Sequence, residues 1–257
     1  MRRLEARARE SDLVPDAQSA AVGDLWRGRP HGPDDRATRH TSPPSEVASS
    51  VDEVTSATST TTGPGITEDL LRYLQQGRDG LIRALEGLDD YDVRRPLTPS
   101  GSNLIGLVKH VAGVELAYLG DAVGRPSGER LSWVEDGSIW ESADMWATAD
   151  ESRDDIVALY RRAWAHCDAV VRELPLDAPA TVDWWPEERR HTTLGSLLVR
   201  CVAEVSQHAG HADILRELID GRGGRDQADM GDAAWWTSYV ARIQAAADAH
   251  RPAVAGS

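Results

Sequence analysis

The sequence has no phenylalanine and only two cysteines among its 257 residues. Cys167 and Cys201 fall inside helix-like stretches, and neither belongs to a CxxC pair. Free cysteine is a residue that globular proteins bury, so we interpret them as two reduced core thiols of a cytoplasmic protein. The nine tryptophans supply much of the large apolar surface that phenylalanine would otherwise provide.

Long apolar runs and excess positive charge are also missing. No run of eighteen apolar residues occurs, so the sequence predicts no transmembrane helix and no membrane partner. The first residues are basic, but no apolar segment follows them, so no secretory signal is predicted. The formal net charge of −14 repels phosphate backbones, which argues against nucleic acid as a partner.

Residues 1–65 differ in composition from the rest of the chain. They are rich in Arg, Asp, Ser, Thr and Pro, with few large aliphatic residues. Such a segment cannot bury enough apolar area to offset its ordering entropy, so we predict a disordered extension. Residues 252–257 are predicted to be a disordered tail. The folded domain is expected over residues 66–251, and His31 and His40 are set aside as site residues.

Within this domain, apolar residues recur at helical spacing in several segments. The expected helices are one capped by Thr67 and ended by Asp89, one opened by Ser100 or Ser102 and closed by Gly124, one over 150–174, one from Thr192 or Thr193 to Gly221, and one over 233–249. Residues 125–149 are predicted to be a loop of the length that functional lids have. No convincing strand lies between the helices. The sequence therefore predicts an all-α fold, a four-helix bundle with an additional C-terminal helix.

Titratable residues interrupt the apolar stripe of the fourth predicted helix. Glu204 and His208 are four residues apart, so they project from one face about one turn apart. An unpaired carboxylate on a core face is costly to bury and needs a cation, a proton or a strong donor. A divalent metal satisfies both side chains, although an ordinary ion pair between them remains the alternative.

A third ligand is expected from the second predicted helix, where His110 lies among inward-facing apolar residues. Bundle metal sites take ligands from facing helices. Two imidazoles and a carboxylate leave coordination positions open, as catalytic zinc sites do, and the set also suits other first-row metals. His211 is a rival ligand. We place it instead beside the site, where it would hydrogen-bond a ligand or touch the substrate.

These residues lie in two runs, PSGSNLIGLVKHVAGVE (residues 99–115) and EVSQHAGHADILRELIDG (residues 204–221), that resemble the DinB-like superfamily. The likeness is greatest to its actinobacterial, "mini-circle protein"-type branch, covers about residues 66–251, and extends to mycothiol-dependent metalloenzymes. The resemblance implies a DinB-like four-helix bundle that binds a divalent metal. His110 matches the ligand from the second helix, and Glu204 and His208 match the pair from the last core helix. His211 stands where many members have glutamine.

The resemblance further implies a thiol-dependent S-transferase in which the metal activates mycothiol against an electrophile. Zinc is the expected metal, with nickel, iron or manganese also suited to the ligands. Trp140, Trp184 and Trp185 are predicted to line the substrate pocket, the alternative being that they pack the bundle edge. A metal-dependent hydrolase and a non-catalytic metal-binding or interaction protein are the other hypotheses. A homodimer is compatible with the predicted bundle.

Overall fold

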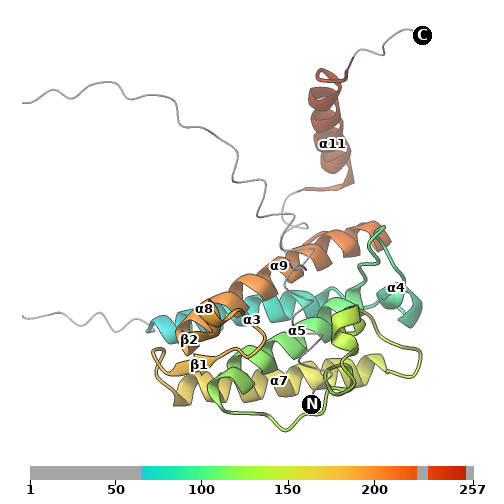
Figure 1. The fold of residues 1–257 in the computed structure, drawn as a ribbon. Helices are drawn as coiled ribbons and strands as arrows, with labels where there is room; N and C mark the ends of the chain where they lie inside the picture. The colour runs from blue at the N-terminus through green and yellow to red at the C-terminus, as the bar shows by residue number, and fades with distance from the viewer. Residues whose placement is uncertain (1–64, 225–230, 253–257) are drawn as a thin grey trace, which may run out of the picture. The chain divides into compact units, whose positions relative to one another are not determined.

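The computed structural model of the chain describes residues 65–224 and 231–252. The disordered segments predicted for the two termini lie, apart from residues 65 and 252, outside the described residues. The long helices (Figure 1) are α3 (Ile66–Arg83), α5 (Leu104–Leu119), α7 (Arg153–Glu173), α9 (Leu194–Asp220) and α11 (Ala233–Asp248). The short elements are α4 (Asp90–Arg94), η1 (Asp121–Val123), α6 (Ser132–Glu135), η2 (Ser138–Glu141), η3 (Ala143–Met145), β1 (Pro179–Thr181), α8 (Glu187–Arg190) and β2 (His191–Thr193). The prediction of an all-α bundle is confirmed.

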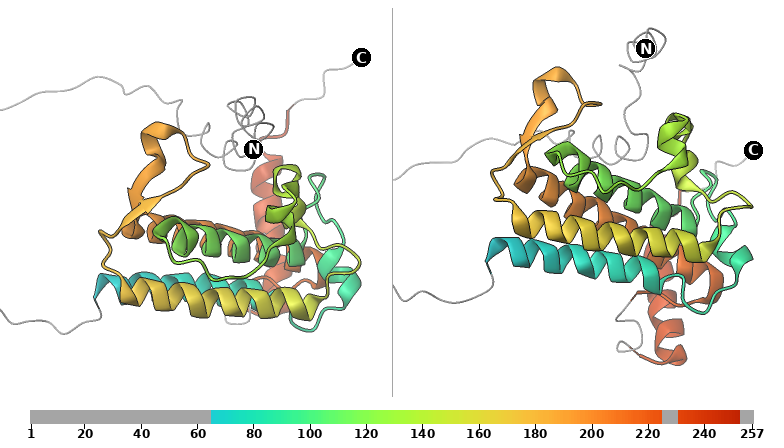
Figure 2. Two further views of the ribbon diagram at one scale, coloured as in Figure 1. Left: turned by 60° about the horizontal axis from the view of Figure 1, so that its bottom comes forward. Right: turned by 90° about the horizontal axis from the view of Figure 1, so that it is seen from below.

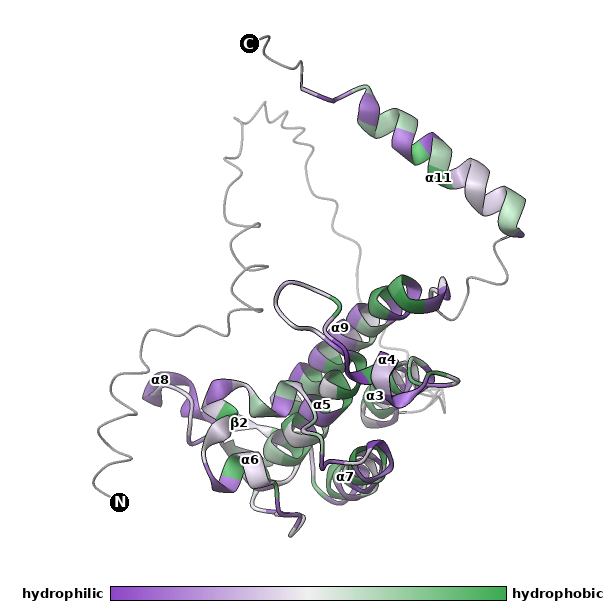
Figure 3. Ribbon diagram, turned by 90° about the vertical axis from the view of Figure 1, so that its right-hand side faces the viewer, coloured by the Kyte–Doolittle hydropathy of each residue, from purple (hydrophilic) through white to green (hydrophobic). Residues whose placement is uncertain are grey.

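Helices α3, α5, α7 and α9 pack around one hydrophobic core. Each presents an apolar stripe inward, and Figure 3 shows hydrophobic and hydrophilic residues on different sides of α7 and α9. The core includes Leu74 of α3, Val108 of α5, Tyr160 of α7 and Leu198 of α9, each fully buried. No helix in the described part of the chain is long and apolar enough to cross a membrane.

Local capping residues define the helix ends, and the sequence predicted some of these residues correctly. Thr193 caps α9, its hydroxyl accepting from the Ser196 N–H, and Gly221 ends that helix at φ 75°, both as predicted. Helix α5 is capped by the Asn103 side chain rather than by a serine. The first helix begins after Gly65 rather than being capped by Thr67. It ends at Arg83, before the predicted Asp89, because residues 84–87 form a turn, and Asp89 instead caps the short α4.

A small antiparallel sheet corrects the expectation that no strand separates the helices. Strands β1 and β2 pair in the connector between α7 and α9, with Ala180 opposite Thr192. Each strand has three residues, too few for a period-two pattern to appear in the sequence. The sheet holds the connector over the start of α9.

The predicted loop over residues 125–149 contains α6, η2 and η3 and is fastened to the bundle. Asn103 Nδ2 donates to the Met145 carbonyl at 3.0 Å. A Cβ atom on Gly106 would clash with the same carbonyl oxygen, so only glycine permits this close approach. Figure 2 shows this segment and the β1–β2 connector standing on the same face of the bundle, towards opposite ends of α5.

A buried arginine links three of the four core helices. Arg78 of α3 is fully buried and donates to both carboxylate oxygens of Glu115 on α5, with the shortest contact at 2.5 Å. Its other terminal nitrogen donates to Asp168 of α7 at 2.8 Å. Breaking one partner of a buried pair leaves the other charge desolvated and uncompensated.

Replacing Arg78 with methionine is therefore expected to lower the free energy of unfolding by about 3–5 kcal/mol, measured by chemical denaturation. Arg72→Met is the matched control on the same helix, because Arg72 pairs with Asp69 in solvent, and its loss should be much smaller. The double variant Arg78→Met/Glu115→Gln should regain part of the loss. Equal losses at Arg78 and Arg72 would contradict this interpretation.

Candidate metal centre

Helices α5 and α9 bring the three predicted ligand residues together. One ligand atom each from His110, Glu204 and His208 lies within 4.8 Å of the other two. Glu204 Oε1 is 3.2 Å from His208 Nε2 and 3.5 Å from His110 Nε2. The imidazole rings stand edge to face with centroids 5.0 Å apart. Two ring nitrogens and a carboxylate oxygen thus converge as they would around one cation.

The cluster is recessed but open to solvent. The His208 side chain is almost fully buried, whereas Glu204 and His110 keep 18% and 20% of their side-chain surface exposed. The segment over residues 125–149 therefore does not seal the site. Solvent therefore reaches two of the three residues, and a three-ligand catalytic site needs such an open side.

Asp144 of η3 fixes the orientation of His110. Its Oδ2 atom lies 2.6 Å from His110 Nδ1, and the residue is buried. A carboxylate at Nδ1 accepts the N–H of that nitrogen, which leaves Nε2 directed at Glu204. Metal-binding histidines donate their other ring N–H to a carboxylate, a backbone carbonyl or a water, and this partner sets the tautomer and holds the ring. The donor set and this partner both fit a metal ion.

The chain's only lysine holds the segment that carries Asp144. Lys109 is buried beside His110 on α5, and its ammonium group donates to the carbonyls of Ala143 and Trp146 at 2.8 and 3.0 Å. It also pairs with Glu151 at 2.8 Å. These bonds flank Asp144 on both sides. Two consecutive residues of α5 therefore have different roles. His110 offers a ring nitrogen to the cluster, and Lys109 holds the segment that carries Asp144, the partner of His110.

The electrostatics of the cluster favour a cation. Burial acts to lower the pKa of His110, but its hydrogen bonds to Asp144 and Glu204 outweigh burial and raise that pKa to about 9. The hydrogen bonds from His110 and His208 lower the pKa of Glu204 well below its usual range despite partial burial. A protonated His110 imidazole thus places a positive charge between the carboxylates of Asp144 and Glu204.

The other predicted site residues are placed differently. The His211 ring lies 5.5 Å from that of His208, so the structure brings it next to the cluster. Trp184 and Trp185 lie together on the connector, each against Tyr118 of α5. Trp140 lies on η2 and is 75% exposed. Among the described residues, no ring contact joins Trp140 to the other two tryptophans.

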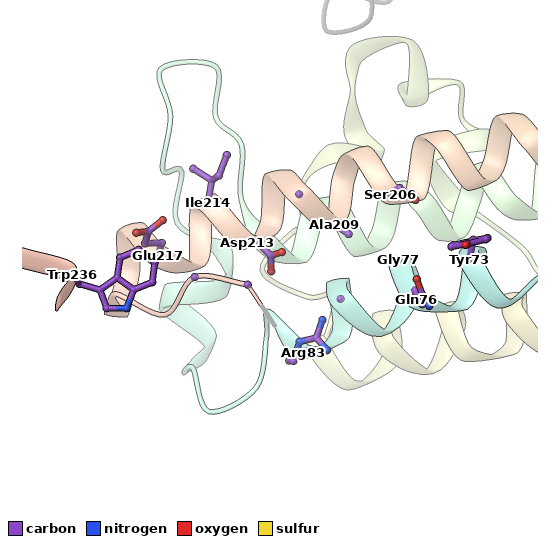
Figure 4. Close-up of a pocket in the computed structure, with 14 residues that line it drawn as sticks. Tyr73, Gln76, Gly77, Arg83, Ser206, Ala209, Asp213, Ile214, Glu217 and Trp236 are labelled. Carbon is purple, nitrogen blue, oxygen red and sulfur yellow. The ribbon is translucent and has the colours of Figure 1, made fainter. Parts of the chain in front are cut away.

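A separate hollow runs along the other side of α9. It measures about 660 Å³ and lies between α3 and α9, as Figure 4 shows, with Gly77, Gly80, Ala209 and Asp213 among the residues that line it. None of the three clustered ligand residues lines this hollow. We therefore assign the chemistry to the α5–α9 face and not to this groove.

A four-helix bundle that clusters His110, Glu204 and His208 from its second and last core helices defines a DinB-like protein. A family model described as mycothiol S-transferase matches residues 69–221, more than half of the chain. The chain belongs to this family. No curated protein matches it.

Asp144 and Lys109 are the site residues that the sequence analysis missed. Asp144 lies among many acidic residues of the predicted loop, and nothing local distinguishes it. Lys109 did carry a signal, because a single lysine inside the apolar run of α5 must bury its charge against a partner. The identity of that partner depends on a contact between residues more than thirty positions apart.

Asp144→Asn is expected to weaken metal binding by about 10- to 100-fold, because the amide cannot hold His110 as the carboxylate does. Competition with a chromophoric chelator measures the affinity. Asp136→Asn, on the same segment but exposed, is the matched control and should bind as the wild type does. Unchanged affinity in Asp144→Asn would show that Asp144 does not support His110.

Metal binding is also expected to release the His110 proton. Because the pKa of His110 is about 9, the ring is protonated at neutral pH and must lose a proton from Nε2 before that atom can bind a metal. The proton release per metal should fall by about one between about pH 7 and about pH 10. Calorimetry in buffers of different ionisation enthalpy measures it, and a pH-independent release would contradict the raised pKa.

Proposed function

We propose that the protein is a metal-dependent S-transferase that joins the thiol of mycothiol to an electrophilic small molecule. The observation that carries this proposal is the convergence of His110, Glu204 and His208 in a recess open to solvent. The family match supports mycothiol as the thiol. Zinc is the metal that we propose, since two imidazoles and one carboxylate with an open position suit it, and nickel, iron or manganese also fit these donors.

In this proposal each residue has a defined task. His110 and His208 each offer a ring nitrogen, Glu204 offers a carboxylate oxygen, and Asp144 holds the His110 ring. A bound divalent metal would supply the Lewis acidity that lowers the pKa of a thiol to near neutral. The thiol loses its proton, its sulfur forms a bond to the electrophilic carbon, and the leaving group departs with the electron pair. We assign His211 contact with the thiol or the electrophile, since its ring lies 5.5 Å from that of His208.

Neither of the chain's two cysteines is suited to be the nucleophile, which favours an external thiol. Cys167 and Cys201 are both free and fully buried in the core, as the sequence predicted. Burial raises the pKa of each thiol well above its ordinary value, so neither forms a thiolate at neutral pH. Thiol chemistry at this site therefore requires a small-molecule thiol. The homodimer considered from the sequence stays a prediction.

His208→Ala is expected to lose both metal and activity, because it removes one of three donors from the recess. Purified wild type should contain about one metal per chain and consume mycothiol in the presence of a haloarene. Elemental analysis and a thiol assay measure the two quantities. His191→Ala, on the exposed strand β2, is the matched control and should keep both.

The same experiment separates the alternatives. Turnover that does not depend on thiol would identify a hydrolase. Stoichiometric metal without turnover of any substrate would indicate a binding protein. Full activity in His208→Ala would overturn the proposed site.

A further inference from the structure

Arg200, Trp184 and Trp185 gather around the buried ring of Tyr118, beside the candidate metal centre. The Cζ atom of Arg200 lies 5.0 Å from the ring centroid of Tyr118 and 5.6 Å from that of Trp185. The rings of Trp184 and Trp185 lie 5.5 and 5.7 Å from the Tyr118 ring. Trp185 Nε1 donates to the Tyr118 hydroxyl at 3.2 Å. We call these four residues the aromatic platform.

The platform has unused binding capacity. Arg200 is exposed and makes no hydrogen bond or ion pair with any residue that the structure describes, whereas Arg78 and Arg216 direct theirs at carboxylates and carbonyls. A guanidinium group has five N–H donors, and stacking on an aromatic ring leaves its edge free to donate. Trp184 is 47% exposed, a large apolar face left in solvent. Donors and apolar faces therefore lie side by side.

The platform and the candidate metal centre lie on the same face of α9. Arg200, Glu204 and His208 are spaced four residues apart, so they form one row along the helix. His110 contacts His208, and Tyr118 contacts Arg200, so α5 and α9 run antiparallel along this row. At 1.5 Å per residue, Arg200 stands about 6 Å along α9 from Glu204 and about 12 Å from His208.

We propose that the aromatic platform binds the sugar-like body of mycothiol and points its thiol at His110, Glu204 and His208. The inference rests on the proposed function and names the part of the protein that selects this thiol. Mycothiol carries its cysteinyl thiol on a neutral, hydroxyl-rich glucosaminyl-inositol body. The tryptophan faces pack against the C–H faces of such rings, with Tyr118 supporting them from beneath, and the Arg200 guanidinium donates to the hydroxyl oxygens of the rings. A single cation among three rings suits this neutral body better than it suits a multiply charged anion.

Steady-state kinetics with two thiols test the platform. Arg200→Ala and Trp184→Ala should each raise KM for mycothiol about tenfold, the loss expected from removing a charge-assisted hydrogen bond or a stacking face. With cysteine, which lacks the sugar body, kcat/KM should stay within about twofold of wild type. Metal content should not change. Arg72→Ala, an exposed arginine of α3, is the matched control.

Equal losses with mycothiol and cysteine would overturn the platform as a sugar site. So would a rise in KM for the electrophile alone, which would assign Arg200 to the other substrate.

A binding measurement separates this inference from the proposed function. N-acetylglucosaminyl-inositol, which keeps the neutral amide of the body and lacks the cysteine, should bind the full-length wild type, measured by calorimetry, and Arg200→Ala should weaken that binding about tenfold. Binding without any turnover would support the platform and overturn the transferase. Mycothiol turnover without Arg200-dependent binding of N-acetylglucosaminyl-inositol would overturn the platform and leave the transferase standing.

Discussion

Two neighbouring residues of α3, Gly77 and Arg78, hold the helices that bring His110, Glu204 and His208 together. Arg78 bonds Glu115 of α5 and Asp168 of α7 from inside the core. At the preceding position, a Cβ atom on Gly77 would come within 2.9 Å of the Val205 side chain, so α3 and α9 touch closely there. One turn of α3 thus holds α5 on one side and α9 on the other. Because the cluster takes its donors from α5 and α9, its geometry depends on this buried pair and this close contact.

The sequence predicted the three candidate ligands because titratable side chains do not normally interrupt the apolar face of a helix. A carboxylate and an imidazole one turn apart on a core stripe are visible in a single helix, and His110 is equally conspicuous in α5. Asp144 breaks no local rule, and its role comes from the bonds that Lys109 makes across the fold. The strands of the connector were missed for a similar reason, since three-residue strands are defined by their pairing and not by a periodic pattern.

The charges of the cluster balance one another around His110. His110 carries the proton that a metal would displace, and Glu204 and Asp144 accept its two N–H groups. The raised pKa of His110 and the lowered pKa of Glu204 describe the same interaction from its two partners. This arrangement contributes stability that is lost as the pH rises through about 9, where the imidazole gives up its charge. The proton and the metal thus compete for one nitrogen.

Two segments outside the helices divide the remaining work on the α5–α9 face. The segment that includes η3 brings Asp144 to His110, and Lys109, Asn103 and Gly106 hold it against α5. The connector that includes β1 and β2 brings Trp184 and Trp185 to Tyr118, on the same face towards the other end of α5. The helices fix the donor atoms, and the segments are free to differ in what they add. In the proposed transferase, the η3 segment would govern how tightly the metal is held, and the connector would govern which thiol reaches it.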